Sequence, residues 1–486
     1  SGPTVSGGGG GGSLARKPIF TTPTLPTPQR ILYCISTAGA GGDGLSVGTA
    51  FNTIGAAEAA AVAGDEVQID GTFVETNTVW FGKSGHVGTA AHPIVFRKRP
   101  GASVADITVG GGANSNNPMN LAGLGDAYHW YHGLTMRYSA GSDGSATCRI
   151  RCNWTTVISC TFVDGSYFVQ GEYHDNEIWD SFITGEIGSD VGNSGDAFYY
   201  GDGANNNRAR RVTITARAYH VAGNLNNSIA DPVVTGHGWV EHNDIFDFDI
   251  TNTAAGGFNI IGGSRYNRFH WNRITGVHTS PSVAFPPSSS EGMEIASNNN
   301  LIEFNIWSYN DNSGISCQTL NINFYEPCFS NTIRNNAVCY NGGVGLVLAS
   351  SGLAGSVFPR DMANNLFENN LIWANHRKVF PRAVGLAADF NTQQTCGFLN
   401  VIGATYKYYP VYLRVSTPRG NDGGVTWADN AFYGNIWRNN WISVDPGEDH
   451  ADYMLLERYP EDGGYKSYGE SDLIANGARS EERRVG

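Results

Sequence analysis

The chain has 486 residues and a formal net charge of −13 at pH 7, with 44 acidic and 31 basic residues. This balance argues against nucleic acid as a partner, because binding to phosphates requires clustered basic side chains. No apolar stretch is long enough to span a membrane as a helix. Charged residues make up only 15%, whereas glycine contributes 63 residues. This composition is typical of stacked coils of short strands.

The first elements predicted are a tail and a helix. Residues 1–30 include a run of glycines and several prolines, which predicts a flexible tail. The chain begins at Ser1 without a methionine or a signal peptide, so we expect a mature or trimmed form. The one convincing helical segment is 50–63, which is rich in alanine and is followed by Gly64.

A six-residue phrase recurs through the middle of the chain: an apolar residue, two variable residues, an asparagine, one variable residue and an apolar residue. Its asparagines are Asn243, Asn272, Asn305, Asn336, Asn370 and Asn440. They lie 29, 33, 31, 34 and 70 residues apart, and the last gap is about two periods. Self-similarity at such a period indicates a repeat protein in which each unit stacks on the previous one.

Each repeat also contains a second segment with apolar residues at alternate positions, as in 257–261 and 292–296. Alternation predicts short strands with one buried face, and Asn and Gly suit the corners between them. Asparagine amides that bond from turn to turn would satisfy polar groups that are costly to bury alone. We therefore predict an all-β fold, a right-handed parallel β-helix solenoid with a short N-terminal capping helix.

The predicted solenoid spans residues 31–445, with 31–110 as an N-terminal module and 111–445 as stacked coils. Residues 446–486 are predicted to cap the open end, because a terminal strand otherwise exposes an edge. The last eight residues, 479–486, resemble a translated sequencing adapter, and we assign them no function.

The eight cysteines show no metal-ligand spacing. An even number is compatible with disulfides in an oxidising compartment. Cys160 and Cys317 fall at inward-facing repeat positions, where free buried thiols are the alternative interpretation.

The N-terminal module carries a resemblance. It contains Leu32-Tyr-Cys-Ile-Ser, Gly41-Gly-Asp-Gly-Leu-Ser and Ala63-Gly-Asp-Glu-Val-Gln-Ile-Asp. Together with the repeats, it resembles the right-handed parallel β-helix (pectate-lyase-like) superfamily of secreted polysaccharide lyases, epimerases and glycosidases. The resemblance covers residues 31 to about 445. It is specific for the fold and weak for the reaction, because one fold hosts many chemistries.

The resemblance implies a secreted, extracellular, carbohydrate-binding protein that cleaves an acidic polysaccharide by β-elimination, as a polysaccharide lyase does. Ca²⁺ is the one cofactor that we expect. The first alternative is a non-catalytic structural or receptor-binding β-helix at a virion surface or cell surface, such as a tail-spike or an adhesin. The second alternative is a glycoside hydrolase. We expect a monomer if the protein is a lyase and a trimer if it is a spike.

A lyase needs a group that neutralises the substrate carboxylate, a base for the α-proton and an acid for the leaving oxygen. The candidate catalytic residues are Glu294, Arg273, Lys378 and His237. The candidate substrate-binding residues are Tyr199, His220, Asp244, Asn259, Ser316 and Gln318. Segment 294–298 resembles the alginate lyase and chondroitinase B group. That group has a lysine where this chain has Ala296 and an arginine near Gln318, so both of its catalytic residues are missing here.

Two further patterns leave alternatives open. The seven arginines 208, 210, 211, 217, 265, 268 and 273 either form a basic stripe for carboxylates and sulfates or balance neighbouring acids. A hydrolase would need two carboxylates on one face, for which Asp244, Asp247 and Asp249 are candidates.

Overall fold

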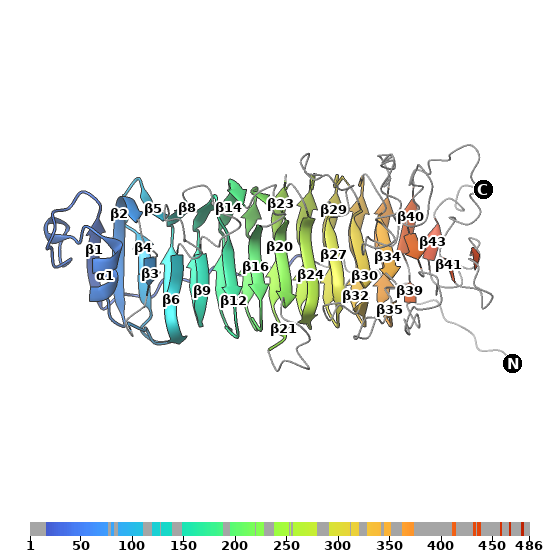
Figure 1. The fold of residues 1–486 in the computed structure, drawn as a ribbon, viewed down its shortest axis with the longest axis horizontal. Helices are drawn as coiled ribbons and strands as arrows, with labels where there is room; N and C mark the ends of the chain where they lie inside the picture. Colours follow the sequence, from blue (N-terminus) through green and yellow to red (C-terminus); the bar gives the residue numbers. More distant parts are fainter. Residues whose placement is uncertain are drawn as a thin grey trace, which may run out of the picture.

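The computed structural model describes residues 16–75, 79–81, 86–109, 119–126, 128–138, 148–187, 195–218, 220–227, 238–251, 253, 256–278, 291–311, 313–319, 328–341, 345–350 and 362–373, and six short strands beyond residue 410. These residues form a long coil of parallel strands (Figure 1). The predicted fold class, a right-handed parallel β-helix, is confirmed.

Each turn of the coil contributes one strand to each of three sheets, in which all pairings are parallel. Strand β2 (Asp65–Glu75) passes from sheet A to sheet B. Sheet A contains β1 (Arg30–Ile35), β4 (Ile94–Lys98), β7 (His129–His132), β10 (Thr156–Ile158), β13 (Glu177–Trp179), β17 (Arg208–Arg210), β22 (Asp244–Phe246), β25 (Arg268–His270), β28 (Leu301–Glu303), β32 (Thr332–Arg334), β36 (Leu366–Glu368) and β39 (Ala431–Tyr433). Sheet B contains β5 (Ala105–Val109), β8 (Thr135–Tyr138), β11 (Thr161–Val163), β14 (Phe182–Thr184), β18 (Thr213–Ile214), β23 (Asp249–Thr251), β26 (Arg273–Thr275), β29 (Ile306–Ser308), β33 (Ala337–Cys339), β37 (Leu371–Trp373), β40 (Asn435–Arg438) and β43 (Ala478–Ser480).

Sheet C has the longer strands and forms the candidate site. It contains β3 (Val79–Phe81), β6 (Met119–Asp126), β9 (Cys148–Asn153), β12 (Tyr167–Gln170), β16 (Asp196–Gly201), β20 (Val221–Asn227), β24 (Gly256–Arg265), β27 (Met293–Asn298), β30 (Ile315–Thr319), β34 (Leu346–Ser350) and β38 (Val411–Arg414), extended by β21 (Val240–Glu241), β31 (Cys328–Phe329) and β35 (Met362–Ala363). The remaining short strands are β15 (Glu186–Ile187), paired with β19 (Arg217–Ala218), and β41 (Glu457–Arg458), paired with β42 (Lys466–Ser467).

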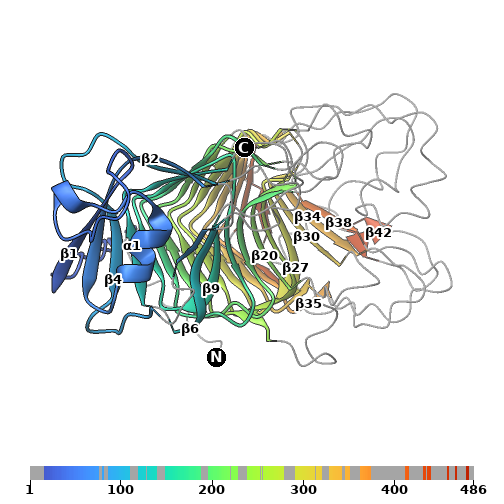
Figure 2. The same ribbon diagram turned by 60° about the vertical axis from the view of Figure 1, so that its left-hand side comes forward.

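Helix α1 (Ile54–Ala60) lies at the N-terminal end of the coil (Figure 2), where it buries Ile54 and Ala57. It follows a 3₁₀ turn, η1 (Val47–Thr49). It is shorter than the predicted 50–63 because Phe51 bonds to the backbone of β1 and so leaves the helix. Thr53 caps its first turn by accepting from Ala56 N–H at 3.2 Å.

Asparagines form ladders along the corners of the coil. In each ladder the backbone N–H and the Nδ2 of one asparagine donate to the Oδ1 of the asparagine one turn further on, as from Asn300 to Asn331 at 3.0 and 3.1 Å. At Asn176 only the backbone N–H donates. The first ladder contains Asn176, Asn207, Asn243, Asn267, Asn300, Asn331 and Asn365. The second contains Asn272, Asn305, Asn336 and Asn370, and a third joins Asn310 to Asn341.

The ladders correct one alignment made from the sequence. Asn243 bonds to Asn267, so it belongs to the first ladder and does not stack on Asn272. The phrase occurs at two successive corners five residues apart, as at Asn331 and Asn336, and the sequence repeat alone cannot tell these corners apart. The residue before each ladder asparagine has a left-handed backbone, for example Tyr266 (φ 55°) and Phe304 (φ 58°). The stacked amides therefore hold corners that non-glycine residues disfavour.

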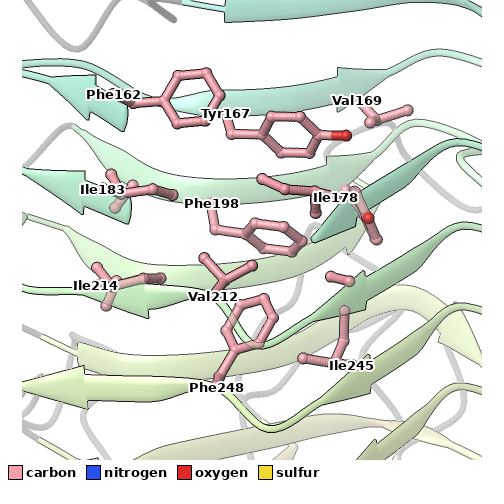
Figure 3. Packing of buried hydrophobic residues seen from close by; sticks show 14 of the residues in the cluster. Phe162, Tyr167, Val169, Ile178, Ile183, Phe198, Val212, Ile214, Ile245 and Phe248 are labelled. Atoms are coloured by element: carbon pink, nitrogen blue, oxygen red, sulfur yellow. The ribbon is translucent and has the colours of Figure 1, made fainter. Parts of the chain in front are cut away.

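The interior of the coil is a continuous apolar core. Side chains at equivalent positions of successive turns stack on one another, as Ile183 does on Phe162 and Ile214 (Figure 3). Cys160 and Cys317 lie in this core as free, buried thiols. Burial raises the pKa of the Cys160 thiol to about 12, so this thiol stays protonated.

The described part of the N-terminal segment runs along the outside of the coil. Lys17 pairs with Asp247, and the ring of Phe20 packs edge-on against Phe246 at 4.7 Å. These contacts differ from the flexible tail that was expected over residues 1–30.

The seven arginines of the suggested basic stripe are each paired with a carboxylate. The pairs are Arg208 with Glu177, Arg210 with Asp244, Arg211 with Asp180, Arg217 with Glu186, Arg265 with Glu241, Arg268 with Glu303 and Arg273 with Asp249. They therefore balance neighbouring acids. Among the described residues, no helix is long and apolar enough to cross a membrane.

Candidate functional site

A column of mostly polar side chains runs along the outer face of sheet C. Alternate residues of its strands, such as Phe198 and Ile295, belong to the apolar core, so the residues between them face outward. The strand register places the outward residues of successive turns next to one another. From β9 to β30 they are Arg149, Phe168, Tyr199, Asn224, Asn259, Glu294 and Ser316.

A second set of side chains lies at the beginning of the same strands. Asp196, at the start of β16, accepts a hydrogen bond from Nδ2 of Asn224 at 3.1 Å, and its other oxygen lies 2.6 Å from Nδ1 of His220. On a later turn Glu291 precedes β27 and interacts electrostatically with Glu294. The carboxyl groups of three residues and one imidazole thus gather on neighbouring turns of one face.

The environments of these groups push their pKa values apart. The carboxylate of Asp196, with a further contribution from Glu294, raises the pKa of His220 and favours the imidazolium. Burial, reinforced by the negative charge of Glu294, raises the pKa of Glu291 well above its usual range. Glu291 is 3% exposed, and its raised pKa favours the neutral form of the carboxyl group. The face thus carries a carboxyl group whose neutral form is favoured and a histidine whose charged form is favoured, an arrangement that suits acid–base chemistry.

Several polar atoms in this region are buried without a hydrogen-bond partner. They are Oδ1 of Asn224 and the hydroxyls of Ser313 and Ser316. Ser316 follows Glu294 in the column, and Ser313 lies just before β30. A buried polar atom without a partner is costly, and these three atoms belong to or adjoin strands of sheet C.

The structure brings five of the ten sequence-predicted site residues to this face. They are Tyr199, His220, Asn259, Glu294 and Ser316. The backbone of Gln318 lies in β30 of the same sheet. His237, Lys378 and the side chain of Gln318 lie outside the described residues.

Asp244 and Arg273, the other two predicted site residues, lie on different sheets and have local partners. Asp244 is in sheet A, where it bonds to His270 at 2.6 Å and to Arg210 at 2.5 Å. Although burial opposes the effect, these two bonds hold the pKa of Asp244 below its usual value. Arg273 is in sheet B and pairs with Asp249 at 2.6 Å. Neither side chain lies beside Glu294, and the roles given to Asp244 and Arg273 from the sequence stay predictions.

The carboxylate set suggested for a hydrolase is also dispersed. Asp244 lies in sheet A, Asp247 at the corner where it pairs with Lys17, and Asp249 in sheet B. They do not share a face. Asp196, Glu291 and Glu294 do share the face of sheet C, and sequence reasoning did not select Asp196 or Glu291.

The raised pKa of His220 gives a direct test of this geometry. Replacing Asp196 by Asn should lower the pKa of His220, because the charge that favours the imidazolium is removed. NMR titration of the His220 ring, assigned with a His220→Gln chain, would measure the shift. Asp175→Asn is the matched control, since Asp175 bonds to a different histidine, His174, at 2.7 Å. An unchanged His220 pKa in Asp196→Asn would contradict the pairing.

The expected Ca²⁺ stays a prediction from the sequence. Among the described residues, no three His, Cys, Asp or Glu side chains gather so that they could hold a metal ion. We therefore derive no step through Ca²⁺.

No family model and no curated protein matches the chain. Solved structures that resemble it share its fold at low identity. Pectate lyase Pel9A is 15% identical with a TM-score of 0.40, covering 82% of this chain and 98% of its own. A PL6 family polysaccharide lyase from Pseudopedobacter saltans is 13% identical with a TM-score of 0.43. The match covers 80% of this chain and 90% of the lyase. The surface protein and adhesin PfbA of Streptococcus pneumoniae is 11% identical with a TM-score of 0.41, covering 77% and 91%. The likeness concerns the fold alone.

Proposed function

We propose that this protein binds a polysaccharide along the outer face of sheet C and cleaves it there by acid–base catalysis, outside the cell. One observation carries the proposal: the buried carboxyl group of Glu291, with its raised pKa, interacts with Glu294 on the face where Asp196 lies 2.6 Å from His220 and raises the pKa of that histidine. Two carboxyl groups with different protonation states provide both an acid and a base. Chemistry at this face also accounts for the unpartnered polar atoms beside it.

The reaction that we propose is β-elimination from a uronate unit. The neutral Glu291 carboxyl and the Asn259 amide would donate to the sugar carboxylate and so make the α-proton more acidic. Glu294 would remove that proton, the bond to the leaving oxygen would break as the double bond forms, and protonated His220 would donate to the leaving oxygen.

Hydrolysis is the second candidate, and the same pair of residues favours it. A glycosidase requires one protonated and one ionised carboxyl group, which flank the scissile bond. Glu291 and Glu294 suit the first part of this requirement, because burial and then the charge of Glu294 raise the pKa of Glu291. The products distinguish the two reactions, since elimination creates an unsaturated sugar and hydrolysis does not.

The test is incubation with a panel of uronate, sulfated and neutral polysaccharides, with and without Ca²⁺. Ultraviolet absorbance reports an unsaturated product, and reducing ends report any cleavage. We expect both signals to rise together on a uronate polymer. Reducing ends without absorbance would replace elimination by hydrolysis. If no polymer of the panel gave either signal, catalysis would be contradicted and a non-catalytic β-helix favoured. A signal that depends on Ca²⁺ would support Ca²⁺ as the cofactor.

A further inference from the structure

Two arginines face outward at the N-terminal end of the same column. In strand β9 the residues Cys148, Ile150 and Cys152 are completely buried in the core. Arg149 and Arg151 alternate with them and therefore point away from the coil. Arg149 is register-paired with Phe168, which in turn pairs with Tyr199, so it belongs to the column that leads to Glu294.

Arg149 lacks the kind of partner that the arginines of sheets A and B have. It forms no ion pair with a carboxylate within the part of the chain that the structure describes, and its Nε is buried without a hydrogen-bond partner. Burial, followed by repulsion from Arg151, lowers its pKa, but a guanidinium still remains charged. Asp202, the acid that acts on Arg149 in the opposite direction, is bonded to Gln170 at 2.7 Å. A half-buried cation with an unused donor favours an anionic ligand.

Aromatic rings connect this arginine pair to the acid–base residues. The rings of Phe168 and Tyr199 lie 4.9 Å apart on adjacent turns. The Tyr199 ring lies over Gly201, where an added Cβ would be 2.2 Å from a ring atom, and its hydroxyl donates to the carbonyl of Asn226 at 3.2 Å. The ring is therefore held rigidly against the strand, and Tyr199 is only 6% exposed.

We propose that Arg149 and Arg151 form an anion-binding subsite that holds a carboxylate or sulfate group of a polysaccharide lying along the coil axis. With about 4.8 Å between neighbouring strands, Arg149 lies roughly 14 Å from Asn224 and roughly 24 Å from Glu294. The subsite would hold an anionic sugar several units from the bond that is cleaved, with Phe168 and Tyr199 between them. This inference deepens the proposed function and rests on it for the identity of the ligand as a polysaccharide.

Binding without turnover tests the subsite separately from catalysis. In a Glu294→Gln chain, Arg149→Gln and Arg151→Gln should each weaken binding to a polyuronate or to a sulfated glycosaminoglycan by about tenfold, as expected for a lost charge-assisted bond. Which of the two polymers shows the loss identifies the anion. Binding should weaken with added salt in the parent chain and less so in the double variant. Arg149→Lys keeps the charge but loses the planar fork and should give an intermediate affinity.

Controls separate a lost subsite from a damaged fold. Arg208→Gln, which removes an exposed arginine paired with Glu177 on sheet A, should leave binding unchanged. A neutral glucan should bind all variants equally. Unchanged affinity for both anionic polymers in the double variant would overturn the proposal, as would an equal loss for the neutral glucan or no binding of an anionic polymer to the parent chain. If anion binding depends on the arginines while the cleavage panel stays silent, the subsite stands and the proposed catalysis fails.

Discussion

Replacing Glu294 by glutamine should lower the rate of polysaccharide cleavage by about 10² to 10⁴-fold, the usual contribution of a positioned acid or base. The amide is similar in size to the carboxylate but cannot accept the proton. The change also removes the negative charge that raises the pKa values of Glu291 and His220, so both groups would become stronger acids. The measurement is kcat and KM on the polymer that the panel identifies, together with the pH profile of kcat.

A matched control distinguishes catalysis from general damage. Asp249→Asn also replaces an acid by its amide, but Asp249 lies in sheet B and pairs with Arg273. Its kcat should stay within about twofold, because single surface changes seldom alter a distant site. A Glu294→Gln chain with nearly normal kcat would refute the assignment of the base, and a raised KM with unchanged kcat would reduce Glu294 to a binding residue.

The fold was predictable because its determinants are local in the sequence. Apolar residues at alternate positions and asparagines at a fixed period are visible without coordinates, and both depend on the geometry of a single turn. The register was less predictable. Asn243 was matched with Asn272 because two corners of each turn share one phrase, and only the bonds from Asn207 and to Asn267 decide between the corners.

The site was predictable where the strands alternate regularly and was missed where they begin. Counting outward positions along sheet C correctly placed Asn259, Glu294 and Ser316 in one column. At the start of β27 the alternation fails, because an added Cβ at Gly292 would meet Trp307 in the core while the next residue, Met293, also packs inward. Two successive inward residues put Glu291 on the side of Glu294, whereas strict alternation would put it on the opposite side.

Charges were the least predictable feature. A sequence shows how many arginines a region has but not which acid stacks beside each one. Arg273, a catalytic candidate from the sequence, pairs with Asp249 on the neighbouring turn, whereas Arg149 forms no ion pair with a described carboxylate. In a solenoid the nearest charged neighbour lies roughly one repeat away in sequence, so pairing depends on variations in repeat length.

The second large effect concerns stability. Asn305→Ala should lower the free energy of unfolding by roughly 3–5 kcal/mol, because several buried groups lose partners worth about 1–3 kcal/mol each. Oδ1 of Asn305 accepts from the backbone N–H and from Nδ2 of Asn272, and its own Nδ2 donates to the carbonyl of Phe269 and to Oδ1 of Asn336. Urea denaturation followed by circular dichroism would measure the loss.

Asn226→Ala is the matched control for this prediction. Asn226 is half-buried, in strand β20, and its side chain forms no ladder, so its replacement should change stability by no more than about 0.5 kcal/mol. If the two variants were equally stable, water molecules would satisfy the hydrogen bonds of the backbone groups at the corners as well as the asparagine amides do. A large loss confined to Asn305→Ala would instead show that the ladder amides hold the left-handed corners. Phe304, which precedes Asn305, has a φ of 58°, and the amide bonds of Asn305 would then offset the strain of that backbone.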